Sequence, residues 1–359
     1  MARVYNFSAG PATLPQACLE EAARELVDYR GQGLSVMEMS HRGAAFEAIF
    51  EEAKARLARL LGLPEGYRIL FLQGGASLQF CMLPMNLLAG GSADYVHTGV
   101  WSGKAMAEAR RFGRVRLAGS SEAEGFHRIP RQEELELDPE ARYCHITTNN
   151  TIYGTQYHYL PETGGVPLVA DCSSDILSRP LDLSRFALIY AGAQKNLGPA
   201  GVTLVVLRES LLERTAQELP TMLAYRTHVA ADSRFNTPPT FAIYMVGLVA
   251  RWLEEQGGVA AVADRNRRKA ERLYRFLDAS DFYRCPTEPE SRSWMNVPFT
   301  LADPGLEAAF LAEAEAEGLV GLKGHRLVGG MRASLYNAMP EAGVEALVAF
   351  LAEFERRHG

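Results

Sequence analysis

The sequence predicts an α/β protein in which a large domain holds a mostly parallel β-sheet and a smaller α+β domain follows it. Short apolar runs alternate with amphipathic helical stretches through the first two-thirds of the chain, and the pattern changes from about residue 281. The 359 residues are 47% hydrophobic and 22% charged, which suits one large domain with a smaller one attached. We expect the large domain over residues 16–258 and the small one over residues 1–15 together with 259–359.

Six apolar runs predict buried strands. They are Arg68–Leu72, Tyr95–His97, Cys144–Thr147, Pro167–Ala170, Leu188–Ala191 and Thr203–Leu207. Helical stretches lie between several of these runs, as in a mostly parallel sheet that helices cover on both faces. Because ligands of such folds bind at the carboxyl ends of the strands, functional side chains are expected directly after these runs.

Apolar residues at helical spacing predict the helices. In the first helix, residues 15–30, the expected stripe consists of Leu19, Ala22, Leu26 and Val27, and a glycine follows it. The other helices are expected at Phe46–Leu61, Phe241–Glu255, Val259–Leu277, Leu306–Glu317 and Glu341–His358. Two more strands, Trp294–Phe299 and Met331–Leu335, complete the small α+β unit.

Composition and charge exclude several classes of function. A net charge of −6 and a sequence pI of about 5.8 argue against a nucleic-acid surface, so an anionic ligand must be held by a few local arginines. Five scattered cysteines without a CxxC pair indicate reduced thiols and no metal site. The N-terminus lacks the features of a signal peptide, and no apolar run approaches the roughly 20 residues that cross a bilayer. We therefore expect a soluble, cytoplasmic protein.

Two polar residues at strand ends, Asp171 and Lys195, carry the chemical argument. Neither is informative alone, because a strand-end aspartate commonly caps a turn and a loop lysine is usually solvated. Together they suit pyridoxal phosphate. An ε-amino group in a dry site can form a Schiff base with an aldehyde, and a carboxylate keeps a pyridine nitrogen protonated so that the ring accepts electrons. The small residues Ala191–Ala193 would let such a ring lie close to the backbone.

Two further segments fit the same cofactor. Gln73–Ser77 follows a strand and opens an apolar helix, so its free amides and the Ser77 hydroxyl can bind an anion. The alternative is an ordinary glycine turn with a serine cap. Trp101 offers an indole that can stack on a pyridine ring, although a lone tryptophan is more often part of a core. The chain contains no GxGxxG, GxxxxGK[ST], HExxH or GxSxG pattern.

Read together, these segments resemble the phosphoserine aminotransferase family, which consists of fold-type-I pyridoxal-phosphate enzymes of class V. The resemblance extends in order from residue 6 to about residue 340. The matching segments are Asn6–Ala12, Met39–Gly43, Leu72–Ser77, Thr98–Ser102, Asn150–Gly154, Asp171–Arg179, Gln194–Pro199, Phe235–Phe241 and Gly324–Arg332. The resemblance implies a seven-stranded, mostly parallel sheet.

The resemblance also implies how the cofactor is held. Lys195 would form the Schiff base and move the proton, Asp171 would pair with the pyridine nitrogen, and Trp101 would stack on the ring. Thr151 would hydrogen-bond the phenolic oxygen of the ring. The cofactor phosphate would be bound by Ala76, Ser77 and Gln194, and by Asn236 and Thr237 of the neighbouring subunit of a homodimer.

For the substrates, the resemblance implies that Arg332 binds the α-carboxylate, which a planar guanidinium recognises well. The distal anion, a phosphate or a side-chain carboxylate, would be surrounded by His41, Arg42, His325 and Arg326. Some family members have an arginine where this chain has Ser77, so these four residues must contribute more here. Without the resemblance, both His-Arg pairs would be interpreted as surface loops.

The implied reaction transfers the amino group of L-glutamate to 3-phosphohydroxypyruvate, giving O-phospho-L-serine and 2-oxoglutarate in serine biosynthesis; a role in pyridoxine biosynthesis is left open. Cysteine desulfurases are a rival class, but they typically have a histidine where Gln194 stands and a catalytic cysteine in a mobile loop. Serine–glyoxylate aminotransferase remains the alternative, although its substrates lack a second anion. A non-catalytic ligand-binding protein on this fold would keep the cofactor but show no spectral change with glutamate.

Overall fold

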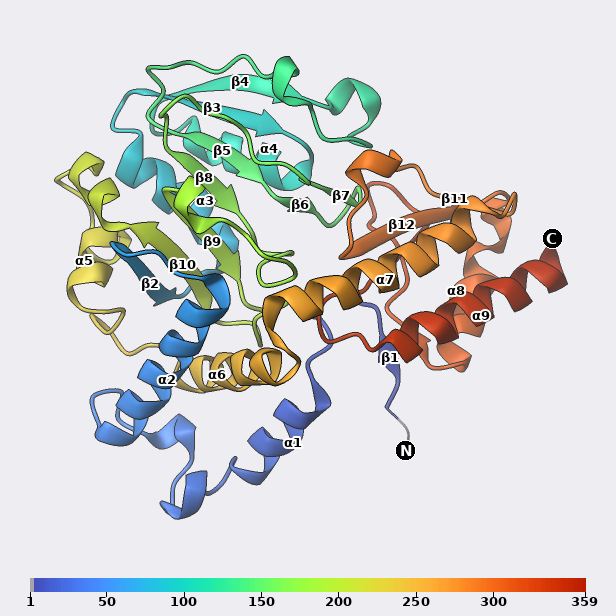
Figure 1. Ribbon diagram of the computed structural model, residues 1–359, viewed down its shortest axis with the longest axis horizontal. Helices are drawn as coiled ribbons and strands as arrows, with labels where there is room; N and C mark the ends of the chain where they lie inside the picture. Colours follow the sequence, from blue (N-terminus) through green and yellow to red (C-terminus); the bar gives the residue numbers. More distant parts are fainter. Residues whose placement is uncertain (1–2) are drawn as a thin grey trace.

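A seven-stranded sheet forms the centre of the larger part of the molecule (Figure 1). The computed structural model describes residues 3–359. The sheet has the order β2-β10-β9-β8-β5-β3-β4. Its strands are β2 (Tyr67–Leu72), β3 (Ser92–His97), β4 (Arg114–Ser120), β5 (Cys144–Thr147), β8 (Leu168–Asp171), β9 (Leu188–Gly192) and β10 (Thr203–Arg208). β10 is antiparallel to both of its neighbours and the other pairs are parallel, so the carboxyl ends of six strands meet at one edge.

Helices cover both faces of this sheet. One apolar core lies between the sheet and α2 (Ala44–Leu61) with α6 (Thr240–Glu255). The other lies against α3 (Gly75–Leu87), α4 (Val100–Ala109) and α5 (Tyr225–Ala230). The helix α2 ends because Gly62 adopts the left-handed conformation, which lets the amides of Gly62 and Leu63 bond the carbonyls of Arg59 and Ala58.

The C-terminal part is a smaller α+β unit with its own core, seen at the right of Figure 1. Its antiparallel sheet contains β11 (Tyr283–Arg284), β12 (Asn296–Leu301) and β14 (Met331–Ser334), and its helices are α7 (Gly258–Asp278), α8 (Glu307–Ala316) and α9 (Glu341–His358). Phe7, beside β1 (Tyr5–Asn6), belongs to this core, and β1 pairs with β13 (Leu319–Val320). The helix α7 contributes to two cores, so the expected boundary at residue 258 stays a prediction.

The remaining elements lie outside these two sheets. They are α1 (Gln16–Arg24), the hairpin of β6 (Asn149–Asn150) with β7 (Thr155–Gln156), and short 3₁₀-helices at Tyr29–Gly31, Val36–Glu38, Glu122–Glu124, Gln132–Glu134, Leu183–Arg185, Glu209–Arg214, Thr221–Leu223, Pro289–Ser291 and Pro304–Leu306. Over residues 3–359, no helix has both the length and the apolar character that a membrane crossing requires.

The fold class is confirmed, and each predicted strand overlaps an observed one. The prediction for the first helix was wrong in its second half. The helix α1 stops at Arg24, and Leu19, Leu26 and Val27 are exposed. The strand β4 was missed because it lies at the edge of the sheet, where little of it is buried and the apolar pattern is weak.

One buried histidine makes the stability of this sheet depend on pH. His145 on β5 stacks on Tyr95 at 4.8 Å and its Nε2 lies 2.9 Å from the Tyr190 hydroxyl oxygen. Burial lowers its pKa from 6.5 to about 3. Between these values the unfolded chain binds a proton that the folded chain does not, so stability is lost as the pH falls. At pH 4.5 we expect a loss of about 2–3 kcal/mol. Urea unfolding at several pH values should show this loss in the wild-type protein and a clearly smaller one in His145→Gln.

Candidate active site

A cavity of about 350 Å³ opens at the edge where the carboxyl ends of the six strands meet. Both halves of the chain contribute to it. It is lined by Ala9, Gly10, Gly75, Ala76, Ser77, Phe80, Trp101, Thr147, Asn149, Thr151, Ile152, Asp171, Ser173, Ser174, Gln194, Lys195, His325 and Arg332. Nine of the fourteen residues that the sequence singled out therefore lie around one space.

Two adjacent strands deliver the amine and the carboxylate. Asp171 is the last residue of β8, and its Oδ1 accepts a hydrogen bond from the backbone amide of Ser173 at 2.9 Å. Lys195 lies in the turn that follows β9. Gly10 packs against this lysine so closely that a Cβ there would lie 3.3 Å from Lys195 Cγ. The amine is thus held between the sheet edge and the N-terminal segment.

Burial shifts the pKa values of both groups toward their neutral forms. It lowers the pKa of the Lys195 ammonium; the charge of Asp171 opposes this shift, and that of Arg332 adds to it. Burial likewise raises the pKa of Asp171, against the effects of Lys195 and of the Ser173 hydrogen bonds. A lysine with a lowered pKa is unprotonated more often at neutral pH, which an amine needs in order to act as a nucleophile or a base.

The start of α3 has free amides that could hold an anion. Gly74 and Gly75 have φ angles of +84° and +64°, and the first backbone hydrogen bond of the helix runs from Leu78 to Gly74. The amides of Gly75, Ala76 and Ser77 precede that bond, so helix geometry leaves them free to bind an anion, with the positive end of the helix dipole behind them.

Hydrogen bonds through Thr151 link two other residues that line the cavity, Trp101 and Arg332. Trp101 Nε1 donates to Thr151 Oγ1 at 3.0 Å, and Arg332 Nη1 donates to the Thr151 carbonyl at 3.0 Å. Within the described chain, Arg332 Nε and Thr147 Oγ1 are buried without a hydrogen-bond partner. Burial lowers the pKa of Arg332. Both Arg332 and Thr147 line the cavity, so a bound ligand could complete their hydrogen bonding.

Of the four residues expected at the distal anion, one lines this cavity. Burial lowers the pKa of His325, and the positive charges of Arg332, Arg326 and Lys104 lower it further. Arg326 is exposed on the loop after β13. His41 and Arg42 lie before α2 and are absent from the cavity lining, although the Nε2 of His41 is buried without a partner among residues 3–359.

Asn236 and Thr237 also lie outside the lining and are exposed. The Thr237 carbonyl accepts a hydrogen bond of 3.2 Å from Gln73 Nε2, so their loop lies at the same edge of the sheet as the cavity.

Several lining residues had no predicted role. Thr147 is the last residue of β5, Asn149 lies two residues after it, and Ser173 and Ser174 follow β8. The rule that ligands bind at the carboxyl ends of strands could therefore have indicated them. Ala9 and Gly10 lie far from the sheet in sequence. No local pattern shows that the N-terminal segment folds back over Lys195.

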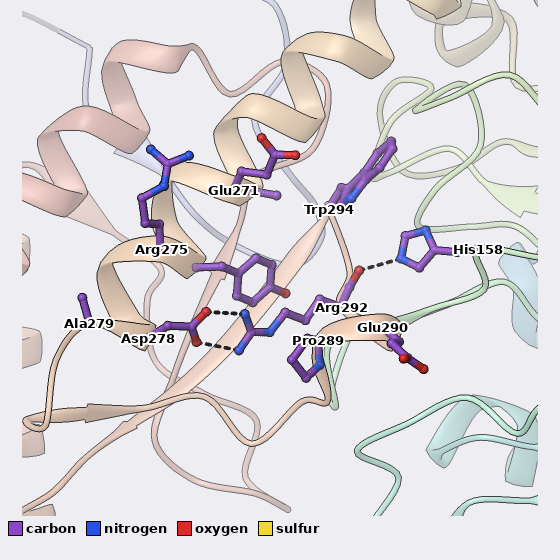
Figure 2. Close-up of a pocket in the computed structure, with 11 residues that line it drawn as sticks. His158, Glu271, Arg275, Asp278, Ala279, Pro289, Glu290, Arg292 and Trp294 are labelled. Carbon is purple, nitrogen blue, oxygen red and sulfur yellow. Dashed lines mark hydrogen bonds and ion pairs between the residues drawn. The ribbon is translucent and has the colours of Figure 1, made fainter.

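A second cavity, of about 580 Å³, lies between α7 and the segment before β12 (Figure 2). There Arg292 forms two hydrogen bonds of 2.6 Å with Asp278, and His158 Nε2 lies 2.9 Å from the Arg292 carbonyl oxygen. The most buried cation of this cavity is therefore already paired, and none of the predicted site residues lines it. The smaller cavity is the candidate active site.

Comparisons with known proteins identify the family. The class V aminotransferase profile matches residues 4–347. The chain belongs to the class V aminotransferases. This aminotransferase is 59% identical to the phosphoserine aminotransferase of Laribacter hongkongensis over 99% of each chain, and 58% identical to that of Aromatoleum aromaticum over the full length of both. These matches also show membership of the phosphoserine aminotransferase family.

Solved structures agree with this assignment. The phosphoserine aminotransferase of Bacillus circulans subsp. alkalophilus superposes on this aminotransferase with a TM-score of 0.98, at 54% identity and 99% coverage of each chain. A pyridoxal-phosphate-bound phosphoserine aminotransferase from Trichomonas vaginalis gives a TM-score of 0.93 at 40% identity, covering 98% of this chain and 100% of that one. An alanine–glyoxylate aminotransferase from Nostoc shares only the fold, at 16% identity.

The cofactor of this aminotransferase family is pyridoxal 5′-phosphate, and the residues present fit it. The amine of Lys195 and the carboxylate of Asp171 share one cavity, and the free amides of α3 open at its wall. Arg332 and Thr147, which also line this cavity, carry buried donors without partners among residues 3–359. A flat, anionic heterocycle would meet complementary groups at its ring and at its phosphate.

A glycine substitution should test the anion site of this aminotransferase. In Gly74→Ala, the new Cβ would lie 2.6 Å from Leu78 Cβ at a φ of +84°. The start of α3 must therefore shift, and we expect cofactor affinity to fall about tenfold or more along with a stability loss of about 2 kcal/mol. Gly66→Ala is the control, because its φ is +77° and nothing lies within 4 Å. Tryptophan fluorescence quenching by pyridoxal phosphate should show weakened binding only for Gly74→Ala; equal affinities would contradict the assignment.

Proposed function

We propose that this chain catalyses the reversible transfer of the amino group of L-glutamate to 3-phosphohydroxypyruvate, giving O-phospho-L-serine and 2-oxoglutarate in serine biosynthesis. The observation that carries the proposal is the meeting of Lys195, Asp171 and Arg332 in one cavity. Relatives at 53–59% identity over the whole chain are phosphoserine aminotransferases, which favours this reaction over that of serine–glyoxylate aminotransferase.

The proposed cofactor contacts follow from the positions of the side chains. Bound pyridoxal phosphate supplies an aldehyde that bonds to amines and a ring that accepts the electrons of a carbon losing its proton. Asp171 would bond the pyridine nitrogen, Trp101 would stack on the ring, and Thr151 would bond its phenolic oxygen. The phosphate would be held by Ala76, Ser77 and Gln194.

Lys195 is the group that we propose moves the proton. Its lowered pKa allows the free amine to take a proton from the α-carbon of the substrate and to return it on the other side of the reaction. Trp101 and Ile152, which also line the cavity, would help to exclude water from the amine. Arg332, with a donor unused, would bind the α-carboxylate that both substrates carry.

The distal anion needs cations at the opposite end of the substrate. His325 and the neighbouring Arg326 would supply part of this charge from the same chain. His41 and Arg42 do not line the cavity of their own chain, so we propose that they act from the partner subunit of a homodimer. Asn236 and Thr237 would reach the cofactor phosphate across the same interface.

The proposed setting of the enzyme is the cytoplasm. All five cysteines are free thiols, as is usual for proteins of a reducing compartment. The proposed domains remain residues 16–258, and 1–15 with 259–359. The separate core around β12 and α9 supports this division.

Stepwise addition of the substrates tests the reaction. Glutamate alone should remove the absorption band of the lysine-bound cofactor, and 3-phosphohydroxypyruvate should then restore it. Serine followed by glyoxylate should do so at least about 10²-fold less efficiently, because those substrates leave the distal cations unpaired. Equal efficiency with both pairs would contradict the proposed substrate, and no spectral change with glutamate would contradict aminotransferase activity itself.

Mixing two inactive variants should test the shared site. We expect Lys195→Ala to be inactive and Asn236→Ala/Thr237→Ala to bind the cofactor weakly. In a mixed dimer, the site that keeps Lys195 receives intact Asn236 and Thr237 from the other chain. Co-refolding at equal amounts should therefore restore about a quarter of the wild-type activity, since half of the dimers are mixed and each has one native site. Activity that stays at the sum of the separate variants would show that these residues do not act across the interface.

A further inference from the structure

A buried lysine outside the cavity has no carboxylate partner among residues 3–359. Lys269 on α7 is 1% exposed, and its Nζ donates to the backbone carbonyls of Leu335 at 3.3 Å, Tyr336 at 2.5 Å and Met339 at 2.9 Å. Three donors thus meet three carbonyls of one short segment between β14 and α9. A fully buried lysine without a counter-ion is rare, because removing the ammonium from water costs several kcal/mol.

The segment that Lys269 holds has a conformation that it would not adopt easily by itself. Tyr336 has a φ of +25°, a region that disfavours residues with a side chain. Burial and the nearby Arg265 lower the pKa of Lys269 to about 7, and the charge of Glu341, which does not form an ion pair with it, opposes this shift. The carbonyl contacts therefore offset both the strained backbone and the buried charge.

Two contacts lead from this segment to the catalytic lysine. The Tyr336 hydroxyl donates to the Ala9 carbonyl at 2.6 Å, which holds Ala9 and Gly10 against one side of Lys195. The backbone amide of Asn337 donates to Asn196 Oδ1 at 3.0 Å, and Asn196 directly follows Lys195. Residues 335–339 thus contact both the N-terminal segment that packs on Lys195 and the residue that follows Lys195.

We propose that Lys269 is a positioning residue: its side-chain nitrogen clamps residues 335–339, and this segment fixes the orientation of Lys195. The proposal rests on the proposed role of Lys195 as the cofactor lysine, but not on the identity of the amino acceptor. Arg332 lies on β14 before the clamped segment, and its bond to the Thr151 carbonyl involves no residue of that segment. Loss of the clamp should therefore impair the proton transfer by Lys195 more than the binding of substrate.

Substitutions in the cofactor-loaded dimer test this. Lys269→Met removes all three donors at similar length, and Lys269→Gln keeps two neutral ones. We expect kcat of the glutamate half-reaction to fall by roughly 10²-fold in Lys269→Met and less in Lys269→Gln, with KM changed less than about threefold. The visible circular dichroism of the cofactor, which reports the orientation of the ring held by Lys195, should weaken in the same order.

Tyr274→Phe is the matched control. Tyr274 lies on the same helix, is buried, and donates one hydrogen bond to the Ser293 carbonyl at 2.9 Å, away from the cavity. The Tyr274→Phe variant should have a lower free energy of unfolding but an unchanged kcat and unchanged visible circular dichroism. A Lys269→Met protein that behaves like Tyr274→Phe would overturn the proposal.

A second variant applies if Lys269→Met does not fold. Asn196→Ala leaves Lys269 in place and removes the acceptor for Asn337, so it should also lower kcat and the dichroism at nearly constant KM. Unchanged values there would overturn the proposal as well. The dichroism and the glutamate half-reaction are measured without phosphohydroxypyruvate. An error in the proposed acceptor would therefore appear only in the second half-reaction.

Discussion

Lys195→Ala should lose the covalently bound cofactor and nearly all activity. Without the amine, no bond to the aldehyde can form and no base lies at the α-carbon, so kcat/KM should fall by at least about 10³-fold. Borohydride reduction followed by mass spectrometry should find the pyridoxyl adduct on Lys195 in the wild-type protein and none in the variant. Lys54→Ala is the control, because Lys54 is paired with Asp232 far from the cavity lining and should keep the adduct.

A Lys195→Ala protein that still forms a reducible adduct would exclude Lys195 as the cofactor lysine. A protein without the adduct but with near wild-type turnover would exclude it as the group that moves the proton. The two measurements therefore separate the two proposed roles of one side chain.

Arg332→Ala should weaken both half-reactions. The guanidinium is partly buried, has an unused Nε donor, and already bonds the Thr151 carbonyl, so it offers a preorganised pair of donors to a carboxylate. Removing one partner of a desolvated charge pair costs about 3 kcal/mol, so kcat/KM should fall by roughly 10²-fold toward glutamate and toward the phosphorylated keto acid alike. Single-turnover absorbance measurements with each substrate give the two values.

Arg332→Lys keeps the charge but not the planar pair of donors, so it should recover only part of the loss. An Arg326→Ala variant provides a contrast, since it should impair the phosphorylated substrate more than one that lacks a distal anion. If Arg332→Ala impaired only one of the two substrates, the guanidinium would have to bind a group that the other substrate does not share.

Most of the central sheet could be predicted because its strands are buried on both faces. Leu188–Ala191 and Leu204–Leu207 are continuous apolar runs, and such runs are visible in the sequence. The exposed residues of β4 give no such signal, and the exposed second half of the predicted first helix shows that helical spacing alone does not create a buried face. Burial is a property of the assembled layers, which a local pattern does not contain.

The residues of the candidate site likewise divide into those that the sequence could predict and those that it could not. Asp171 and Lys195 follow strands, so the parallel order of the sheet brings them together, and their partnership could be inferred from the chain alone. Arg332 and His325 come from the small unit, and only the family resemblance indicated them. Ala9, Gly10 and Lys269 were not predicted at all. Their importance depends on the N-terminal segment and α7 packing against the loop of Lys195, which are contacts between parts of the chain far apart in sequence.

The reversed direction of β10 has a consequence for how a complete enzyme is assembled. Its last residue, Arg208, lies opposite the start of β2, at the edge of the sheet remote from the cavity. Residues 209–236 must therefore lead the chain back to the opposite edge of the sheet, which holds the cavity. There the Thr237 carbonyl accepts its hydrogen bond from Gln73. This return path ends at the exposed residues Phe235, Asn236 and Thr237. If Asn236 and Thr237 reach a partner subunit as proposed, the single strand that runs against its neighbours is what places this stretch of chain at the protein surface.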